Sequence, residues 1–151
     1  MNDHLEVRES EGKGMGVFAT KDIPKGTVIE TCYLIKVDTK VEELGNLYGY
    51  VFKYPKKGTF QHLVLPCGYG SIYNHDDSNN AYWVDSDKPM HFDYIATKDI
   101  EAGEEICTHY GATYWSQMAK RTNDLKKVTR FNAEAEQRFQ DALAGPPALD
   151  F

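Results

Sequence analysis

Three short segments of this chain contain residue types that can bind a small molecule or take part in a reaction. They are Gly14-Met15-Gly16 near the beginning, Asn74-His75 in the middle, and Tyr110 with the glycine that follows it. Alternating glycines allow the backbone to approach a ligand closely, and amide, imidazole and phenol groups form hydrogen bonds. Each segment alone is a weak signal, because loop asparagines and strand tyrosines are common without any catalytic role.

The first glycines also match a dinucleotide-binding fingerprint, since Gly14 to Ala19 follow the pattern G-x-G-x-x-A. That fingerprint needs a strand before the glycines, a helix after them and an acidic residue about 20 positions further on. Here Pro24 and Gly26 follow in a polar turn, and Pro24 would break the required helix. We therefore reject a dinucleotide site and retain only a close backbone approach, to form a bulge or to meet a ligand.

The run His75-Asp76-Asp77 has the side chains of a metal site, but three consecutive residues do not easily converge on one ion. We interpret it as a solvated turn and predict no metal. Cys32, Cys67 and Cys107 form no C-x-x-C pair, which excludes a zinc ribbon and disfavours a disulfide scaffold. This cysteine usage fits a reducing compartment.

An internal repeat indicates the elements that position these segments. The segment from Phe18 to Ile29 matches the segment from Ile95 to Ile106, and Ala-Thr-Lys-Asp-Ile is identical in both. Each copy has β-forming residues, a polar turn with a glycine, and β-forming residues again. We expect two similar hairpins within one mostly β domain.

In the last part of the chain the spacing of apolar residues differs from that of the repeated segments. Apolar residues recur there every three or four positions, which predicts one face of an α-helix. Three roles are open for this helix: packing on its own domain, a contact in a homodimer, or a flap over a site. The apolar positions are Leu125, Val128, Phe131, Ala135, Phe139 and Ala142.

Taken together and in order, the three segments resemble the SET domain of protein lysine methyltransferases. That pattern has an early G-x-G, a central N-H-x-x-x-x-N and a late G-E-E-[LI]-x-x-x-Y-G, which here are Gly14 to Gly16, Asn74 to Asn80 and Gly103 to Gly111. The chain is most similar to the minimal SET proteins of viruses and bacteria, which end in a Y-G-x-x-Y-W like that of residues 110–115.

The resemblance implies a mostly β, β-clip-like fold of small sheets and hairpins. We expect residues 1–115 to form the SET domain and residues 116–151 to form a C-terminal helical tail. The segment from Glu105 to Tyr110 would be threaded beside the segment from Asn74 to Asn80 as a pseudoknot. This threading would bring Tyr110 and Asn74 together.

The resemblance also implies S-adenosylmethionine as the cofactor. Gly14-Met15-Gly16 would contact it, with Met15 and Gly16 using backbone groups. Asn74 would bind its methionine moiety, and His75 would contact its adenine, largely through the backbone. Tyr110 would be the catalytic tyrosine, with its hydroxyl beside the methyl group that is transferred. The implied activity is methylation of the ε-amine of a protein lysine.

This chemistry needs alignment and desolvation, with neither a metal nor a strong general base. The lysine amine attacks only when neutral, although its ordinary pKa is about 10.4, and an apolar channel beside a sulfonium favours the neutral form. We expect the channel to be aromatic, with Tyr50 and Tyr73 lining it. The alternative for both is an ordinary aromatic residue of the β core or sheet edge.

Several positions depart from the longer family pattern R-F-x-N-H-x-C-x-P-N. Ser71 replaces the arginine, Asp77 the cysteine and Asn79 the proline, and His109 stands where an aspartate commonly precedes the catalytic tyrosine. These departures leave open a catalytically inactive SET-like module that binds a peptide or protein. A β-clip domain of another function would leave the Asn-His and Glu-Ile…Tyr-Gly elements unexplained.

The charge distribution indicates what kind of partner to expect. Residues 1–115 carry 11 basic and 18 acidic side chains, whereas residues 116–151 carry 6 and 5. An acidic body argues against direct nucleic-acid binding and suits a basic, lysine-containing protein such as a histone, although acidic proteins are common. The apolar runs are too short for a membrane span, and no secretory signal is visible. We expect an intracellular protein, cytoplasmic by default and nuclear if its substrate is a histone.

Overall fold

The computed structural model describes residues 3–58 and 61–110. The expected tail helix in 116–151, with its three possible roles, lies outside the described residues. Within them the chain is mostly β, and two short 3₁₀ helices, η1 (Val41–Glu43) and η2 (Gly45–Tyr50), follow one another in the middle. In the part of the chain that is described, no helix has the length and apolar character needed to cross a membrane.

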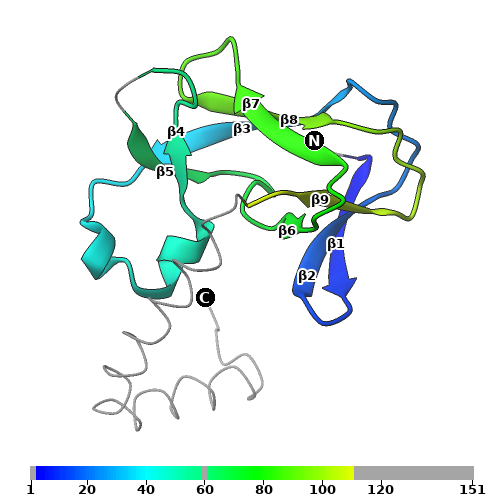
Figure 1. The fold of residues 1–151 in the computed structure, drawn as a ribbon, viewed down its shortest axis with the longest axis horizontal. Coiled ribbons are helices and arrows are strands. Elements are labelled where there is room, and N and C mark those ends of the chain that lie inside the picture. Colours follow the sequence, from blue (N-terminus) through cyan, green and yellow to red (C-terminus); the bar gives the residue numbers. More distant parts are fainter. Residues whose placement is uncertain (1–2, 59–60, 111–151) are drawn as a thin grey trace, which may run out of the picture. The chain divides into compact units, whose positions relative to one another are not determined.

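Across residues 3–58 and 61–110, nine strands form two sheets (Figure 1). The four-stranded sheet has the order β1-β2-β9-β6, and the five-stranded sheet has the order β4-β5-β3-β8-β7. The first sheet contains β1 (Leu5–Ser10), β2 (Gly14–Ala19), β9 (Glu105–Thr108) and β6 (Asn74–His75). The second contains β4 (Phe52–Tyr54), β5 (His62–Pro66), β3 (Val28–Lys36), β8 (His91–Ala96) and β7 (Ala81–Asp85).

Alternation along β3 shows why these segments form strands with one buried face. Cys32 and Leu34 point into the core, whereas Thr31, Tyr33 and Ile35 between and beside them are exposed. Burying the apolar side chains of this inner face stabilises the fold by roughly 1.5–3 kcal/mol for each large residue. The largest fully buried side chains are Tyr73, Tyr94, Phe92, Ile29, Leu34, Ile100 and Ile106.

The internal repeat does not form two hairpins, so that part of the sequence interpretation is wrong. The first copy connects β2 to β3 and the second connects β8 to β9, and each therefore crosses between the two sheets. The copies pair with each other: Ile23 and Ile100 exchange two backbone hydrogen bonds of 2.7 and 2.8 Å. Asp22 and Asp99 repeat this relationship, because each carboxylate accepts a backbone N–H from the opposite copy.

The pairing of β6 with β9 positions the functional segments. β6 runs parallel to β9, with Asn74 opposite Cys107 and His75 opposite Thr108. Asn80 fastens the following loop to the same strand, because its side chain donates to the Glu105 carbonyl (2.9 Å) and accepts from the Cys107 N–H (2.8 Å). β9 lies between β2 and β6 (Figure 1), so the segment leading to Tyr110 runs beside the segment from Asn74 to Asn80, as expected.

Candidate active site

Tyr110 is held at two points by the segment that contains Asn74. Its backbone N–H donates to Nδ1 of His75 (3.0 Å), and its hydroxyl donates to the backbone carbonyl oxygen of Tyr73 (2.7 Å). The rings of His75 and Tyr110 are also neighbours, with centroids 5.3 Å apart. The second and third sequence segments therefore meet, although 36 positions separate Asn74 from Tyr110.

The first segment joins them through the side chain of Asn74. Its Nδ2 donates to the backbone carbonyl of Met15 (3.0 Å) and to Oε2 of Glu105 (2.9 Å). The other carboxylate oxygen of Glu105 accepts a 2.6 Å hydrogen bond from the hydroxyl of Ser10. A chain of hydrogen bonds thus connects β1, β2, β9 and β6, and it brings all three segments into one site.

The absence of a side chain at Gly16 permits this contact, because a Cβ atom there would force the neighbouring side chains or the strand to move. A Cβ atom at position 16 would lie 2.5 Å from Oε2 of Glu105 and 2.9 Å from Nδ2 of Asn74. Real Cβ atoms do not approach other atoms so closely. The second glycine of the early G-x-G therefore lets β2 approach the side chains of Asn74 and Glu105. This neighbour is neither of the two that the sequence suggested, a bulge or a ligand.

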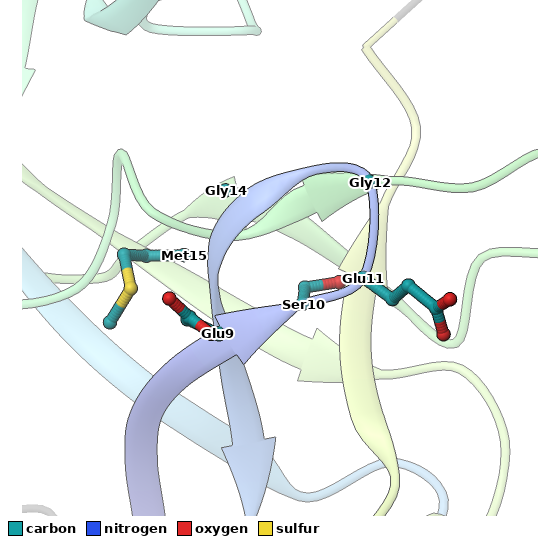
Figure 2. Close-up of a pocket in the computed structure, with 6 residues that line it drawn as sticks. All are labelled: Glu9, Ser10, Glu11, Gly12, Gly14 and Met15. Atoms are coloured by element: carbon teal, nitrogen blue, oxygen red, sulfur yellow. The ribbon is translucent and has the colours of Figure 1, made fainter.

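A cavity of about 520 Å³ opens at the turn between β1 and β2. Figure 2 shows the carboxylate of Glu9 and the side chain of Met15 on one side of this hairpin, with Glu11 pointing the other way. The volume lies within the range of small-molecule sites, and Glu9 offers negative charge to a cationic ligand. Of the residues expected to bind the cofactor, Gly14 and Met15 line this cavity. The lining residues are Glu9, Ser10, Glu11, Gly12, Gly14 and Met15.

The two tyrosines expected to line a substrate channel lie in different surroundings. Tyr50, at the end of η2, is 51% exposed, and its carbonyl accepts a hydrogen bond from the Ser71 hydroxyl (2.7 Å). Tyr73 is only 2% exposed, and its ring packs against Tyr94 with centroids 4.2 Å apart. The Tyr73 side chain thus occupies the core while its carbonyl faces Tyr110. The lining of a channel by either residue stays a prediction.

A buried carboxylate supports the segment before Asn74. Glu30 on β3 accepts hydrogen bonds from the hydroxyl of Tyr73 (2.8 Å) and the backbone N–H of Tyr69 (3.0 Å). Burial, with a further contribution from Glu30, raises the pKa of Tyr73 well above its ordinary value. Burial likewise raises the pKa of Tyr94, whose hydroxyl donates to the Gly70 carbonyl (2.6 Å). Both phenols therefore stay neutral and hold the loop that leads to the site.

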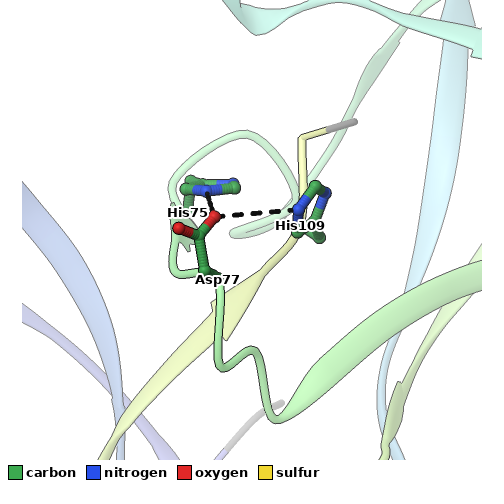
Figure 3. A group of neighbouring side chains, drawn as sticks. All are labelled: His75, Asp77 and His109. Carbon is green, nitrogen blue, oxygen red and sulfur yellow. Dashed lines mark hydrogen bonds and ion pairs between the residues drawn. The ribbon is translucent and has the colours of Figure 1, made fainter. Parts of the chain in front are cut away.

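A second histidine, which the sequence did not indicate, lies beside the run His75-Asp76-Asp77. His109, just before Tyr110, approaches it, and the nearest ligand-type atoms of His75, Asp77 and His109 all lie within 4.8 Å of one another (Figure 3). The two imidazole rings meet edge to face, with centroids 4.6 Å apart. Lys13 also reaches this region, because its ammonium donates to the His75 carbonyl (3.2 Å).

Sequence reasoning assigned no role to Glu105, Ser10 or Asn80, which form the hydrogen bonds around the site. The signal available for Glu105 and Asn80 was their place in two of the matched motifs, G-E-E-[LI]-x-x-x-Y-G and N-H-x-x-x-x-N. No signal in the sequence pointed to Ser10, since its partner lies 95 positions away.

Comparison with known proteins agrees with this geometry. The pattern of the SET-domain family matches residues 14–111, which is more than half of the chain. The chain therefore belongs to the SET-domain family. Its relatives define the class of enzyme as the protein-lysine N-methyltransferases.

Two curated relatives and one solved structure illustrate the similarity. A Schizosaccharomyces pombe protein named histone-lysine N-methyltransferase, H3 lysine-37 specific, is 35% identical over 117 residues, covering 74% of this chain and 76% of its own length. N-lysine methyltransferase KMT5A-A of Danio rerio is 30% identical over 125 residues, covering 74% of this chain and 36% of its own length. A crystal structure of a Plasmodium falciparum protein described as a candidate histone methyltransferase has a TM-score of 0.61 and 28% identity, covering 76% of this chain and 99% of that one.

Proposed function

We propose that this protein transfers a methyl group from S-adenosylmethionine to the ε-amine of a lysine in a basic protein, with Tyr110 as the catalytic residue. The observation that carries the proposal is the anchoring of Tyr110 by Tyr73 and His75, on either side of Asn74. Asn74 in turn contacts the backbone of Met15. A catalytic phenol and the residues assigned to the cofactor thus share one rigid network.

The cofactor, when bound, supplies a methyl group on a positively charged sulfur. Gly14-Met15-Gly16 and Asn74-His75 would hold it. The hydroxyl of Tyr110 and the carbonyl of Tyr73 place two oxygens side by side, which suits weak C–H···O contacts with a methyl group. Alignment of the reacting atoms, rather than acid–base chemistry, would then provide most of the rate enhancement.

We propose a histone or another lysine-rich protein as the substrate. The acidic charge of residues 1–115 favours association with a basic segment. The fission yeast relative is named for a lysine of histone H3. A histone substrate would place this protein in the nucleus.

The direct test is transfer of a labelled methyl group. The purified chain of residues 1–151 is incubated with methyl-labelled S-adenosylmethionine and either core histones or a lysate. The same reaction is run with Tyr110→Phe and with Tyr33→Phe. Tyr33 serves as a matched control because it is an exposed tyrosine on β3 whose ring contacts His91.

We expect label on a protein lysine with the wild-type chain and with Tyr33→Phe, and a loss of about 100-fold or more with Tyr110→Phe. Cofactor binding without transfer to any protein would support a catalytically inactive binding module. Absence of cofactor binding would contradict the proposed function altogether.

A further inference from the structure

The imidazole of His75 links two functional parts of the site, and its hydrogen bonds define which nitrogen carries the proton. Nδ1 accepts the backbone N–H of Tyr110 (3.0 Å), so Nδ1 has no hydrogen of its own. The hydrogen of the neutral ring is therefore on Nε2. Nε2 lies 2.9 Å from Oδ1 of Asp77 and donates to it.

Asp77 lies close to both His75 and His109. Its Oδ1 lies 2.9 Å from Nε2 of His75 and 3.8 Å from Nε2 of His109 (Figure 3). The side chain of His75 is 12% exposed, whereas that of Asp77 is 93% exposed. A carboxylate at the surface thus reaches the outer nitrogen of a mostly buried ring, whose inner nitrogen contacts Tyr110.

Charged and titratable groups approach this ring from three parts of the fold. Asp77 and Asp76 belong to the loop after β6, and His109 and Tyr110 follow β9. Lys13, from the β1–β2 turn, donates to the His75 carbonyl and lies 3.9 Å from Asp76. Asp77 is the group in contact with the ring nitrogen opposite Tyr110.

A divalent metal is the competing interpretation of two histidines and one aspartate. A metal bound to Nε2 of a neutral imidazole requires the proton on Nδ1. In this site Nδ1 faces the N–H of Tyr110, and a second hydrogen there would place two donors against each other. The hydrogen bond to Tyr110 therefore disfavours a metal at His75.

We propose that Asp77 and His75 are positioning residues for Tyr110. Asp77 holds the His75 ring in its orientation with the proton on Nε2, and the ring then anchors the backbone of the catalytic tyrosine. The inference rests on the proposed function, because it assumes that Tyr110 acts in methyl transfer. It adds a specific role for Asp77, at a position where the family pattern has cysteine.

The first test is spectroscopic and requires no activity. Long-range ¹H–¹⁵N correlation spectra of the ¹⁵N-labelled chain identify the protonated ring nitrogen of each neutral histidine, and His75→Asn assigns the signal. We expect His75 to carry its proton on Nε2. A proton on Nδ1 would overturn the proposal. Displacement of the Nε2 proton of His75 by equimolar Zn²⁺ would also overturn it, in favour of a metal site.

The second test separates positioning from binding. Asp77→Ala removes the acceptor, Asp77→Asn keeps an oxygen there, and Asp87→Ala removes an exposed aspartate from the β7–β8 turn as a control. We expect Asp77→Ala to lower kcat about threefold, a typical effect of one hydrogen bond, with KM for S-adenosylmethionine unchanged. Asp77→Asn should restore most of kcat, and Asp87→Ala should match the wild type.

Two substitutions of His75 with matched shapes test the hydrogen bond between its Nδ1 and the backbone N–H of Tyr110. Asn and Leu have nearly the same shape, but only Asn can place an acceptor near the position of Nδ1. We expect His75→Asn to retain more kcat than His75→Leu, by about fivefold. Equal kcat in the two variants, or a kcat in Asp77→Ala equal to that of the wild type, would overturn the proposal. A wild-type chain without transfer activity would instead contradict the proposed function, and the spectra would still report the state of the His75 ring.

Discussion

The side chains of Asn74 and Glu105 are joined by a 2.9 Å hydrogen bond between Nδ2 and Oε2, which links β6 to β9. Asn74 lies in the central N-H-x-x-x-x-N motif, and Glu105 lies in the late motif that ends at Tyr110 and Gly111. Because Glu105 also accepts from Ser10 on β1, a single carboxylate fixes three strands around Asn74. The orientation of Asn74, and with it the contact to Met15, depends on this carboxylate.

Replacement of Glu105 should therefore disturb the site as well as the fold. We expect Glu105→Ala to lower the free energy of unfolding by about 1–3 kcal/mol, because Asn74 and the buried hydroxyl of Ser10 lose their acceptor. Glu105→Gln should lower the free energy of unfolding by less, since its amide oxygen can still accept from Asn74. Denaturant unfolding measures both variants. Equal stability of Glu105→Ala and the wild type would contradict this account of the network.

Gly16→Ala tests the close approach of β2 to the side chains of Asn74 and Glu105. The new methyl group would lie 2.5 Å from Oε2 of Glu105, so the strand or the carboxylate must move. We expect weaker binding of S-adenosylmethionine by calorimetry, by about tenfold, together with lower stability. Met15→Ala is the control for stability, because it trims a half-exposed side chain and leaves the backbone carbonyl that Asn74 uses. A Gly16→Ala chain with wild-type affinity would show that this approach does not matter for the cofactor.

The buried phenols predict a loss of stability in alkali. Burial raises the pKa of Tyr73 and Tyr94 well above the ordinary value, whereas in the unfolded chain both ionise near pH 10. Above about pH 10 the unfolded state loses protons that the folded state keeps. The contribution of the two tyrosines to the free energy of unfolding is therefore fully present below about pH 10 and declines above it. Unfolding free energies measured between pH 8 and pH 11 should fall, and less steeply in Tyr73→Phe. Identical slopes would contradict the contribution from Tyr73.

Thiol reactivity should distinguish Cys67 from the other two cysteines. Burial is the main cause that raises the pKa of the Cys107 thiol to about 11 and that of Cys32 further, whereas Cys67 is exposed. The thiolate is the reactive form, so one thiol should react quickly with a disulfide reagent at pH 8 in the native protein. Three should react after unfolding. Fast native labelling that persists in Cys67→Ser would contradict the burial of Cys32 and Cys107.

The sequence allowed the three site segments to be identified because their residue types and order are specific. It also indicated the mostly β fold, through the β-forming residues and polar turns of the repeated segments. It did not reveal that the repeated segments cross between sheets. A strand–turn–strand pattern is the same whether the second strand pairs with the first or joins another sheet. Only the observed strand order of the two sheets distinguishes these cases.

The contacts around the site were harder to predict for a related reason. Asp77 and His109 are 32 positions apart, and they meet only because β6 and β9 run parallel and in register. Tyr73 was expected to line an aromatic channel or to be an ordinary core aromatic, and the sequence did not show which. Glu30 on β3 accepts a hydrogen bond from the buried Tyr73 hydroxyl and so supplies the partner that a buried phenol needs.

The most direct measurement of the central claim is a single-turnover reaction followed by mass spectrometry. It uses saturating S-adenosylmethionine and the protein substrate that accepts the most label, with the wild-type chain and Tyr110→Phe compared in parallel. We predict methylation of a lysine side chain by the wild-type chain, and a rate at least about 100-fold lower for Tyr110→Phe at unchanged cofactor affinity. Equal single-turnover rates for the two proteins would contradict the assignment of Tyr110 as the catalytic residue.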